Sequence, residues 1–424
     1  MNKLIEIFDF LSASGWKYGI IILLLTLIIK IGVVRVQQFL FVLLGVFIPT
    51  SIAITNLIIG LLALCWILER NFKAKFDIIK FSKWMLAVFA LIGFYGLGML
   101  WGEQHFNADW QFQRLALLFV FPIFMTMNLK QETIGRAVFA FLGTAFISAL
   151  VALAINNNII SPLGKYFSFI DPSLRNSAFI TYNYHNVILA LATTLSFYIL
   201  IEKKTKYSSL LFLFIIAYAI SVFTERGRAG QIIFNLSSIF YILYYNNNRK
   251  YILRGLSLFL LLFSFQLLIY NSTNVYKDRF DAVSNIIQNN GDKGEGNLDD
   301  IRYVFTKESL SRILEKPILG YGTGSFGTIF KNEVKSGHNF YTHTTPHNQY
   351  LYVWFELGIF GLVLLLLIFY NQLKELFKKE DGIHRVLLPL SFMFLMLVDS
   401  YFFIFILTIC YIFLYTIYSR YQQE

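Results

Sequence analysis

The chain has 424 residues and a formal net charge of +11; 57% of its residues are hydrophobic and only 14% are charged. A soluble domain carries about 25% charged residues, so this composition excludes an ordinary soluble protein and indicates a chain that crosses a membrane many times. The basic residues lie mostly in short loops between apolar runs, which favours membrane topology over nucleic-acid binding as the reason for the charge.

Apolar runs close to the roughly 20 residues that a bilayer requires predict the membrane-spanning helices. The first three runs are crowded and fit either two or three helices, so we expect an all-α polytopic protein with 12, or else 13, spans. We expect residues 1–424 to form one membrane domain. In chain order the runs cover about 18–35, 38–50, 54–69, 83–101, 113–128, 134–155, 184–201, 207–223, 229–245, 250–271, 347–370, 384–399 and 401–419.

Lysine-rich loops assign the two sides of the membrane. The loops at 70–83, 202–206 and 371–385 carry clusters of lysine and arginine, which the positive-inside rule places in the cytoplasm. Every second loop from residue 69 onward falls on that side. The segment 272–346 then becomes one large periplasmic loop before the last three spans. Within this loop we expect short helices, including an amphipathic helix near 299–315 that Lys316-Pro317 ends.

The first candidate segment on the outer side is Thr224-Glu225-Arg226-Gly227-Arg228-Ala229-Gly230. The positive-inside rule disfavours arginine on the outer side of the membrane. Arg226 and Arg228 lie there in spite of it, so they are candidates for binding an anion. Guanidinium groups match phosphate oxygens, and a helix N-terminus favours negative charge. The alternative is a hairpin loop whose arginines reach towards lipid headgroups.

The second candidate segment begins at Arg302, in the expected loop helix, and continues to a glycine-rich turn around Tyr321. In that turn, Gly322-Thr323-Gly324 could let the backbone approach a ligand closely. The Lys-Ser/Thr of a phosphate-binding P-loop does not follow, so the turn does not predict nucleotide binding. The alternative is a loop helix with solvated charges and a tight turn.

The third candidate segment is His347-Asn348, at the boundary between a polar loop and an apolar helix. His343 lies four residues earlier, which is a metal-ligand spacing on a helix, but Pro346 places His343 in the loop and no acidic or cysteine cluster accompanies the pair. We therefore expect no metal. An interfacial histidine without a chemical role is the alternative. Gly358 and Gly361 are interpreted as small residues for close helix packing.

Taken in this order, the three segments resemble the O-antigen ligase/polymerase family of bacterial inner-membrane glycosyltransferases. The ligase motif is His-Asn/Ser/Gln, nine residues, Gly, two residues, then Gly/Thr/Tyr, and His347, Asn348, Gly358 and Gly361 fit it without a gap. Residues 315–322, Glu-Lys-Pro-Ile-Leu-Gly-Tyr-Gly, resemble the family's proline- and glycine-containing stretch.

The two arginines on the outer side extend the resemblance. Arg302 matches the arginine that begins the helix before that stretch, and Arg228 matches the arginine of a Gly-Arg-Thr-Gly-like motif. Arg226 is an additional arginine, which leaves open which of the pair matters most.

The resemblance implies an O-antigen ligase in the bacterial inner membrane with a site facing the periplasm. Such an enzyme transfers a glycan from undecaprenyl diphosphate to a sugar hydroxyl of lipid A–core, without a metal or other cofactor and with inversion. It implies that Arg228 and Arg302 bind the diphosphate with help from Arg226. His347 would accept the acceptor's proton or contact the diphosphate.

Three further residues complete the implied site, and two alternatives remain. Asn348, His343 and Tyr321 are the expected further substrate contacts.

An O-antigen polymerase, which joins lipid-linked repeat units, shares these motifs and remains an alternative function. A polysaccharide transporter or flippase is an alternative of another class. It predicts repeated halves and ionisable residues deep inside helices.

Overall fold

The computed structural model describes residues 28–102, 113–163, 178–202, 206–225, 227–245, 298–333 and 345–421. Within these ranges the regular structure is entirely helical. The helices are α2 (Val33–Phe47), α3 (Ile52–Leu68), α4 (Phe72–Phe81), α5 (Lys83–Gly98), η1 (Leu117–Phe119), α7 (Val120–Thr126), α8 (Gln131–Asn156), α9 (Tyr182–Glu202), α10 (Ser208–Thr224), α11 (Arg228–Tyr245), α14 (Leu298–Glu315), α15 (Ser325–Glu333), α16 (Gln349–Phe377), α17 (Gly382–Arg385), α18 (Leu387–Val398), η4 (Tyr401–Phe403) and α19 (Phe405–Arg420).

The predicted all-α architecture is confirmed over the described residues, whereas the number of membrane crossings stays a prediction. Helices α8, α9 and α16 are long and apolar enough to cross a bilayer alone, and shorter apolar helices occupy most other predicted spans. The predicted span 250–271 and most of 18–35 lie outside the described residues. The chain is therefore a helical membrane protein.

Helix α4 occupies the loop predicted at 70–83 and was not expected. It follows α3 after a bend of 112°. Lys75 is buried there, because its ammonium group lies 2.9 Å from a Glu69 carboxylate oxygen and donates to the Trp66 carbonyl at 2.6 Å. The sequence places Lys75 among the basic residues of the loop at 70–83, whereas in the structure the end of α3 supplies its acceptors.

Helix α19 lies at the centre of the fold. Every residue from 406 to 419 is buried, and α19 contacts α7, α8, α9 and α18. Such a position suits a helix that is apolar all round, because no face of it suits water. Around this centre, α16 packs against α5 and α18, and α2 lies along α8.

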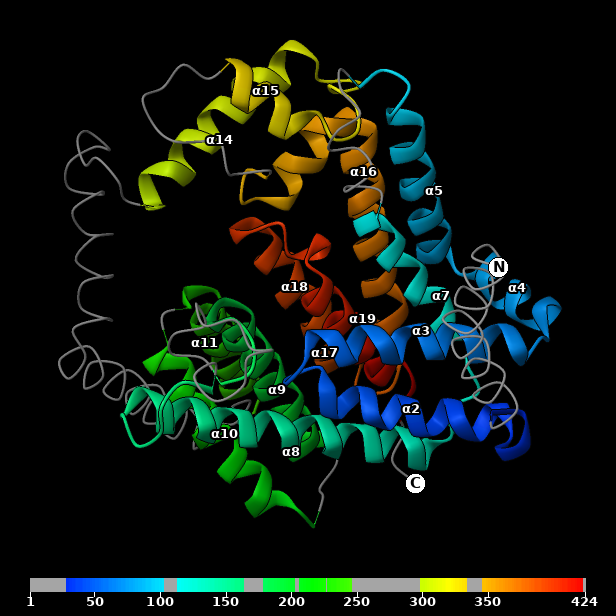
Figure 1. Cartoon of the computed structure of the whole chain (residues 1–424), viewed down its shortest axis with the longest axis vertical. Coiled ribbons are helices and arrows are strands. Elements are labelled where there is room, and N and C mark those ends of the chain that lie inside the picture. Colours follow the sequence, from blue (N-terminus) through cyan, green and yellow to red (C-terminus); the bar gives the residue numbers. More distant parts are fainter. Residues whose placement is uncertain are drawn as a thin grey trace, which may run out of the picture.

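Helices α14 and α15 lie together at one end of the molecule, next to the start of α16 (Figure 1). The sequence placed a loop helix near 299–315, and α14 at Leu298–Glu315 confirms it. Pro317 follows the end of α14, as expected from a residue that cannot continue a helix. These two helices, the segment between them and the start of α16 hold the candidate site.

Candidate functional site

Helix α16 is broken at Gly358, and the segment 317–324 fills the break. Gly358 has φ 64° and ψ −164°, which is backbone space open essentially to glycine alone. The freed backbone groups are satisfied by the segment: the Tyr321 N–H donates to the Phe355 carbonyl at 2.9 Å, and the Gly322 N–H donates to the Glu356 carbonyl at 2.8 Å. In return, the Ile359 N–H donates to the Pro317 carbonyl at 2.9 Å.

This arrangement corrects the interpretation of Gly358 and Gly361 as helix-packing residues. A Cβ on Gly358 would lie 2.0 Å from the Ile318 carbonyl oxygen, so Gly358 is required by the segment 317–324. A Cβ on Gly361 would lie 2.3 Å from Cβ of Leu357, in the preceding turn of the same helix. Both glycines of the motif thus allow the break in α16.

The glycine-rich turn is bound by protein instead of lying open to a ligand. The Thr323 N–H donates to the Gly98 carbonyl at 3.1 Å, and a Cβ on Gly322 would lie 2.4 Å from Cα of Gly102. The Gly324 N–H donates to a carboxylate oxygen of Glu356 at 2.9 Å, and Glu356 is fully buried. The close approach predicted for this turn is therefore made to α5 and α16.

Tyr321 is held within the same segment. Its hydroxyl donates to a carboxylate oxygen of Glu315 at 2.7 Å, its ring stacks on Phe355 with centroids 4.8 Å apart, and the Lys316 ammonium group lies 4.5 Å from its ring centroid. Burial, followed by the hydrogen bond to Glu315, raises the pKa of Tyr321 to about 12. The hydroxyl is thus a neutral donor at physiological pH, directed to Glu315.

His347 lies at the start of α16 and faces Asp399, which follows α18. Imidazole Nδ1 is 3.1 Å from Asp399 Oδ1, and about a quarter of each side chain is exposed, 25% and 21%. His347 has φ 53°, an uncommon value for a residue other than glycine. The pair is therefore oriented by protein while remaining accessible to a substrate.

Asn348 is the N-cap of α16, and both ends of its amide are bound. Its carbonyl oxygen accepts the N–H groups of Tyr350 at 3.0 Å and Leu351 at 3.1 Å, as expected of an N-cap asparagine. Its Nδ2 donates to the Leu397 carbonyl at 3.3 Å. Asn348 therefore holds the end of α18 against the start of α16, next to the His347–Asp399 pair.

Helix α14 brings the Arg302 position close to His347. The buried Phe305 ring lies 5.9 Å from the His347 ring, centroid to centroid. Arg302 is three residues earlier in α14, and residues with this spacing are neighbours on a helix surface. The placement of the Arg302 side chain lies outside what the structure describes.

Arg228 begins α11 and is half-buried. The glycines beside it serve packing: a Cβ on Gly230 would lie 1.8 Å from Asn186 Oδ1, and one on Gly227 would lie 2.8 Å from Asn186 Cβ. Helix α11 also contacts α18, the helix that ends before Asp399. Arg226 and His343 lie outside the described residues.

Two charged residues at the candidate site, Asp399 and Arg114, were not predicted as site residues. Arg114 attracts the carboxylates of Asp399 and Glu356, and Tyr184, at the start of α9, also interacts with Asp399. The sequence held a signal for both charges, because Asp399 interrupts the apolar stretch between the last two predicted spans and Arg114 begins an apolar run on the outer side. Only the fold shows that they meet.

The fold and this site define a helical membrane protein with a histidine–aspartate pair beside an arginine-bearing loop helix. Residues 211–366 match the O-antigen ligase family. A Rickettsia conorii protein named as a presumed polysaccharide ligase is 37% identical over 78 residues, which cover 17% of this chain and 18% of that relative. The chain is therefore similar to the O-antigen ligase family over residues 211–366, and the part it shares with the curated relative is less than a fifth of that relative's length.

Proposed function

We propose that this protein is an O-antigen ligase that transfers a glycan from undecaprenyl diphosphate to a sugar hydroxyl of lipid A–core. The reaction takes place at the periplasmic face of the bacterial inner membrane. The observation that carries the proposal is the His347–Asp399 pair at the start of α16, with α14 and its Arg302 position alongside. The family match over residues 211–366 supports it, since Arg228, Arg302 and His347 all lie within the match.

The acceptor hydroxyl loses its proton to His347. An ionised carboxylate only accepts hydrogen bonds, so Nδ1–H of His347 donates to Asp399 and Nε2 is the nitrogen that takes the proton. The acceptor oxygen then attacks the anomeric carbon opposite the diphosphate, which inverts its configuration. Asp399 stabilises the imidazolium that forms. A general base of this kind contributes about 10²–10⁴-fold to the rate.

The diphosphate leaves with the electron pair of the broken glycosidic bond. Arg228 and Arg302, assisted by Arg226, neutralise the charge that develops on it, because guanidinium groups offer paired donors to phosphate oxygens. No metal takes part in this proposal. His343 contributes a further substrate contact. We assign structural roles to Asn348 and Tyr321. The Asn348 amide binds the start of α16 and the end of α18, and the Tyr321 hydroxyl binds Glu315.

The test expresses the full chain in a bacterial strain that lacks its own O-antigen ligase and examines lipopolysaccharide on a gel. Restored attachment of glycan to lipid A–core is the expected result. A parallel arm uses a strain that lacks its polymerase. If only the polymerase-deficient strain regains long glycans, the protein is a polymerase and the ligase assignment is wrong.

A further inference from the structure

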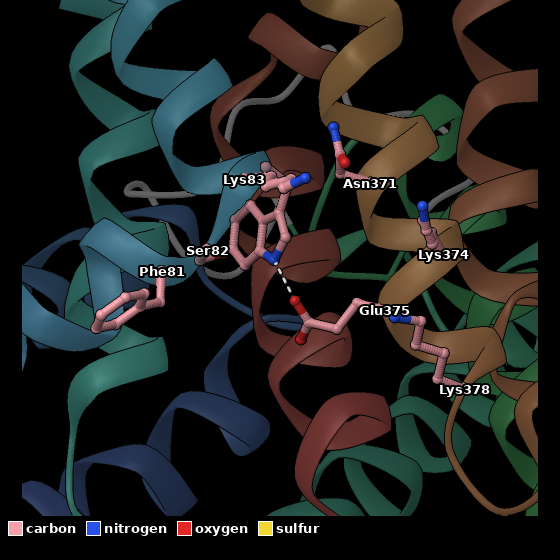
Figure 2. A pocket seen from close by; sticks show the side chains of 8 residues that line it. Phe81, Ser82, Lys83, Asn371, Lys374, Glu375 and Lys378 are labelled. Atoms are coloured by element: carbon pink, nitrogen blue, oxygen red, sulfur yellow. Dashed lines mark hydrogen bonds between the residues drawn. The ribbon is translucent and has the colours of Figure 1, made fainter.

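A pocket of about 290 Å³ lies at the C-terminal end of α16, beside the junction of α4 and α5 (Figure 2). Its lining includes one carboxylate, Glu375, and three lysines, Lys83, Lys374 and Lys378. The pocket is separate from the proposed transfer site. Residues 359–377 of α16, which follow the break at Gly358, rise roughly 28 Å at 1.5 Å per residue, about the thickness of a bilayer's hydrocarbon core.

The lining of the pocket carries a net positive charge, with three lysines against one carboxylate. The Glu375 carboxylate accepts a hydrogen bond from the indole N–H of Trp84 at 2.8 Å (Figure 2). This bond holds the carboxylate beside Trp84, another residue of the lining. Over the part of the chain that the structure describes, none of the three lysines lies within ion-pair distance of a carboxylate. The buried Ser82 hydroxyl, also in the lining, has no hydrogen-bond partner among the described residues. This set of donors suits an anion.

Exposed aromatic residues of α4 lie in and beside the pocket, which favours an anion carried by a lipid. Phe81, the last residue of α4, lines the pocket and is 81% exposed. Phe72 and Phe76 of the same helix are also exposed, and Lys73 and Lys80 accompany them. A short helix with exposed aromatic and basic residues suits the interface between membrane and water.

We propose that this pocket binds the phosphate group of an anionic membrane lipid such as phosphatidylglycerol. Lys83, Lys374 and Lys378 contact the phosphate, and Phe81 contacts the acyl chains. The positive-inside rule assigns this lysine-rich end of α16 to the cytoplasmic side, where basic pockets between helices bind anionic headgroups. The proposal does not depend on the transfer reaction at the other end of the helix.

The test measures lipid binding to the purified full chain in nanodiscs by native mass spectrometry. One set of nanodiscs contains phosphatidylglycerol and the other contains only zwitterionic phosphatidylcholine. We expect retained phosphatidylglycerol on the wild type. We expect about thirtyfold weaker binding for the Lys374→Gln/Lys378→Gln variant, because each lysine near an anionic lipid contributes about fivefold. Inorganic phosphate is added in a separate arm.

A matched control removes two lysines from the same side of the protein outside the pocket. Lys73→Gln/Lys379→Gln has the same change in net charge, and it should bind phosphatidylglycerol as the wild type does. Equal loss in both double variants would overturn the proposal, because it would show diffuse surface attraction. So would displacement of the lipid by millimolar inorganic phosphate, which would make a soluble phosphate the ligand. Asn371→Phe narrows the pocket without changing charge and should also weaken binding; wild-type binding by both pocket variants contradicts the site.

Discussion

His347 and Asp399 lie 52 residues apart in the chain, yet imidazole Nδ1 is 3.1 Å from the Asp399 carboxylate. Asp399 also accepts the Ser400 N–H at 2.7 Å, which fixes the carboxylate in place. The neighbouring Asn348 side chain donates to the Leu397 carbonyl. The start of α16 and the end of α18 are thus joined by two side-chain contacts that together orient one imidazole.

Gly358→Ala should destabilise the protein. Backbone in the region of Gly358 costs any other residue about 1–3 kcal/mol, and the new Cβ would collide with the Ile318 carbonyl. We expect a clearly lower midpoint of thermal unfolding in detergent. Gly93→Ala is the control, because that helical glycine of α5 has open space around it and alanine favours helix there. Equal midpoints of thermal unfolding for the two variants would show that the break in α16 does not require glycine at position 358.

Glu356→Leu should loosen the segment 317–324. The buried Gly324 N–H would lose its acceptor, and such a loss costs about 1–3 kcal/mol. Glu356→Gln keeps an acceptor oxygen and should cost less. Thermal unfolding and the rate of chymotrypsin cleavage after Tyr321 measure the effect. A leucine variant that is as stable and as resistant to cleavage as the glutamine variant would contradict this role.

The buried His185–Glu225 pair should show strong coupling. The two side chains are fully buried, with Nδ1 2.7 Å from the carboxylate, and His185 Nε2 also lies 2.8 Å from Ser148 Oγ. Removing one partner leaves the other buried and unpaired, so His185→Leu and Glu225→Leu should each destabilise more than half as much as the double variant. A double-mutant cycle on thermal stability measures the coupling, expected at about 1–3 kcal/mol. If the destabilisations of the two single variants add up to that of the double variant, the two side chains are not coupled.

Arg302→Ala should lower glycan transfer strongly, whereas Arg312→Ala should not. The two arginines are on the same helix, but Arg302 lies one turn before Phe305, which faces His347, while Arg312 lies 3.5 Å from an exposed Glu315 carboxylate. We expect about 10²-fold loss for Arg302→Ala, as for removal of one charge-stabilising donor. Transfer rates with lipid-linked donor measure it. Similar rates for both variants would remove Arg302 from the site.

Much of the helical layout could be predicted from the sequence because it rests on local signals. The apolar runs predicted at 134–155 and 347–370, and Pro317 after the end of α14, are signals that require no knowledge of partners. Helix α4 was missed because its lysines resemble a loop, and Lys75 finds its partners only where α3 ends.

Part of the geometry around the candidate site could be predicted from the sequence, for the same reason. The His347-Asn348 dipeptide can be recognised in the sequence because it lies where a polar loop meets an apolar run. Asn348 is the N-cap of the helix predicted there. Asp399 and Arg114 come from distant segments, so only the packing of α18 and the helical segment 113–126 brings them together. The break at Gly358 depends on backbone donors from residues 317–324, which periodicity does not reveal.

The most direct test of the catalytic pair measures glycan transfer in proteoliposomes with lipid-linked donor and lipid A–core acceptor. His347→Ala should lower the rate about 10²–10⁴-fold and Asp399→Asn at least about tenfold, with donor binding retained. The double variant should be no slower than His347→Ala, since the two groups act as a unit. The control Asp77→Asn, an exposed carboxylate on α4, should transfer normally. Wild-type rates from folded His347→Ala protein would contradict the proposed mechanism.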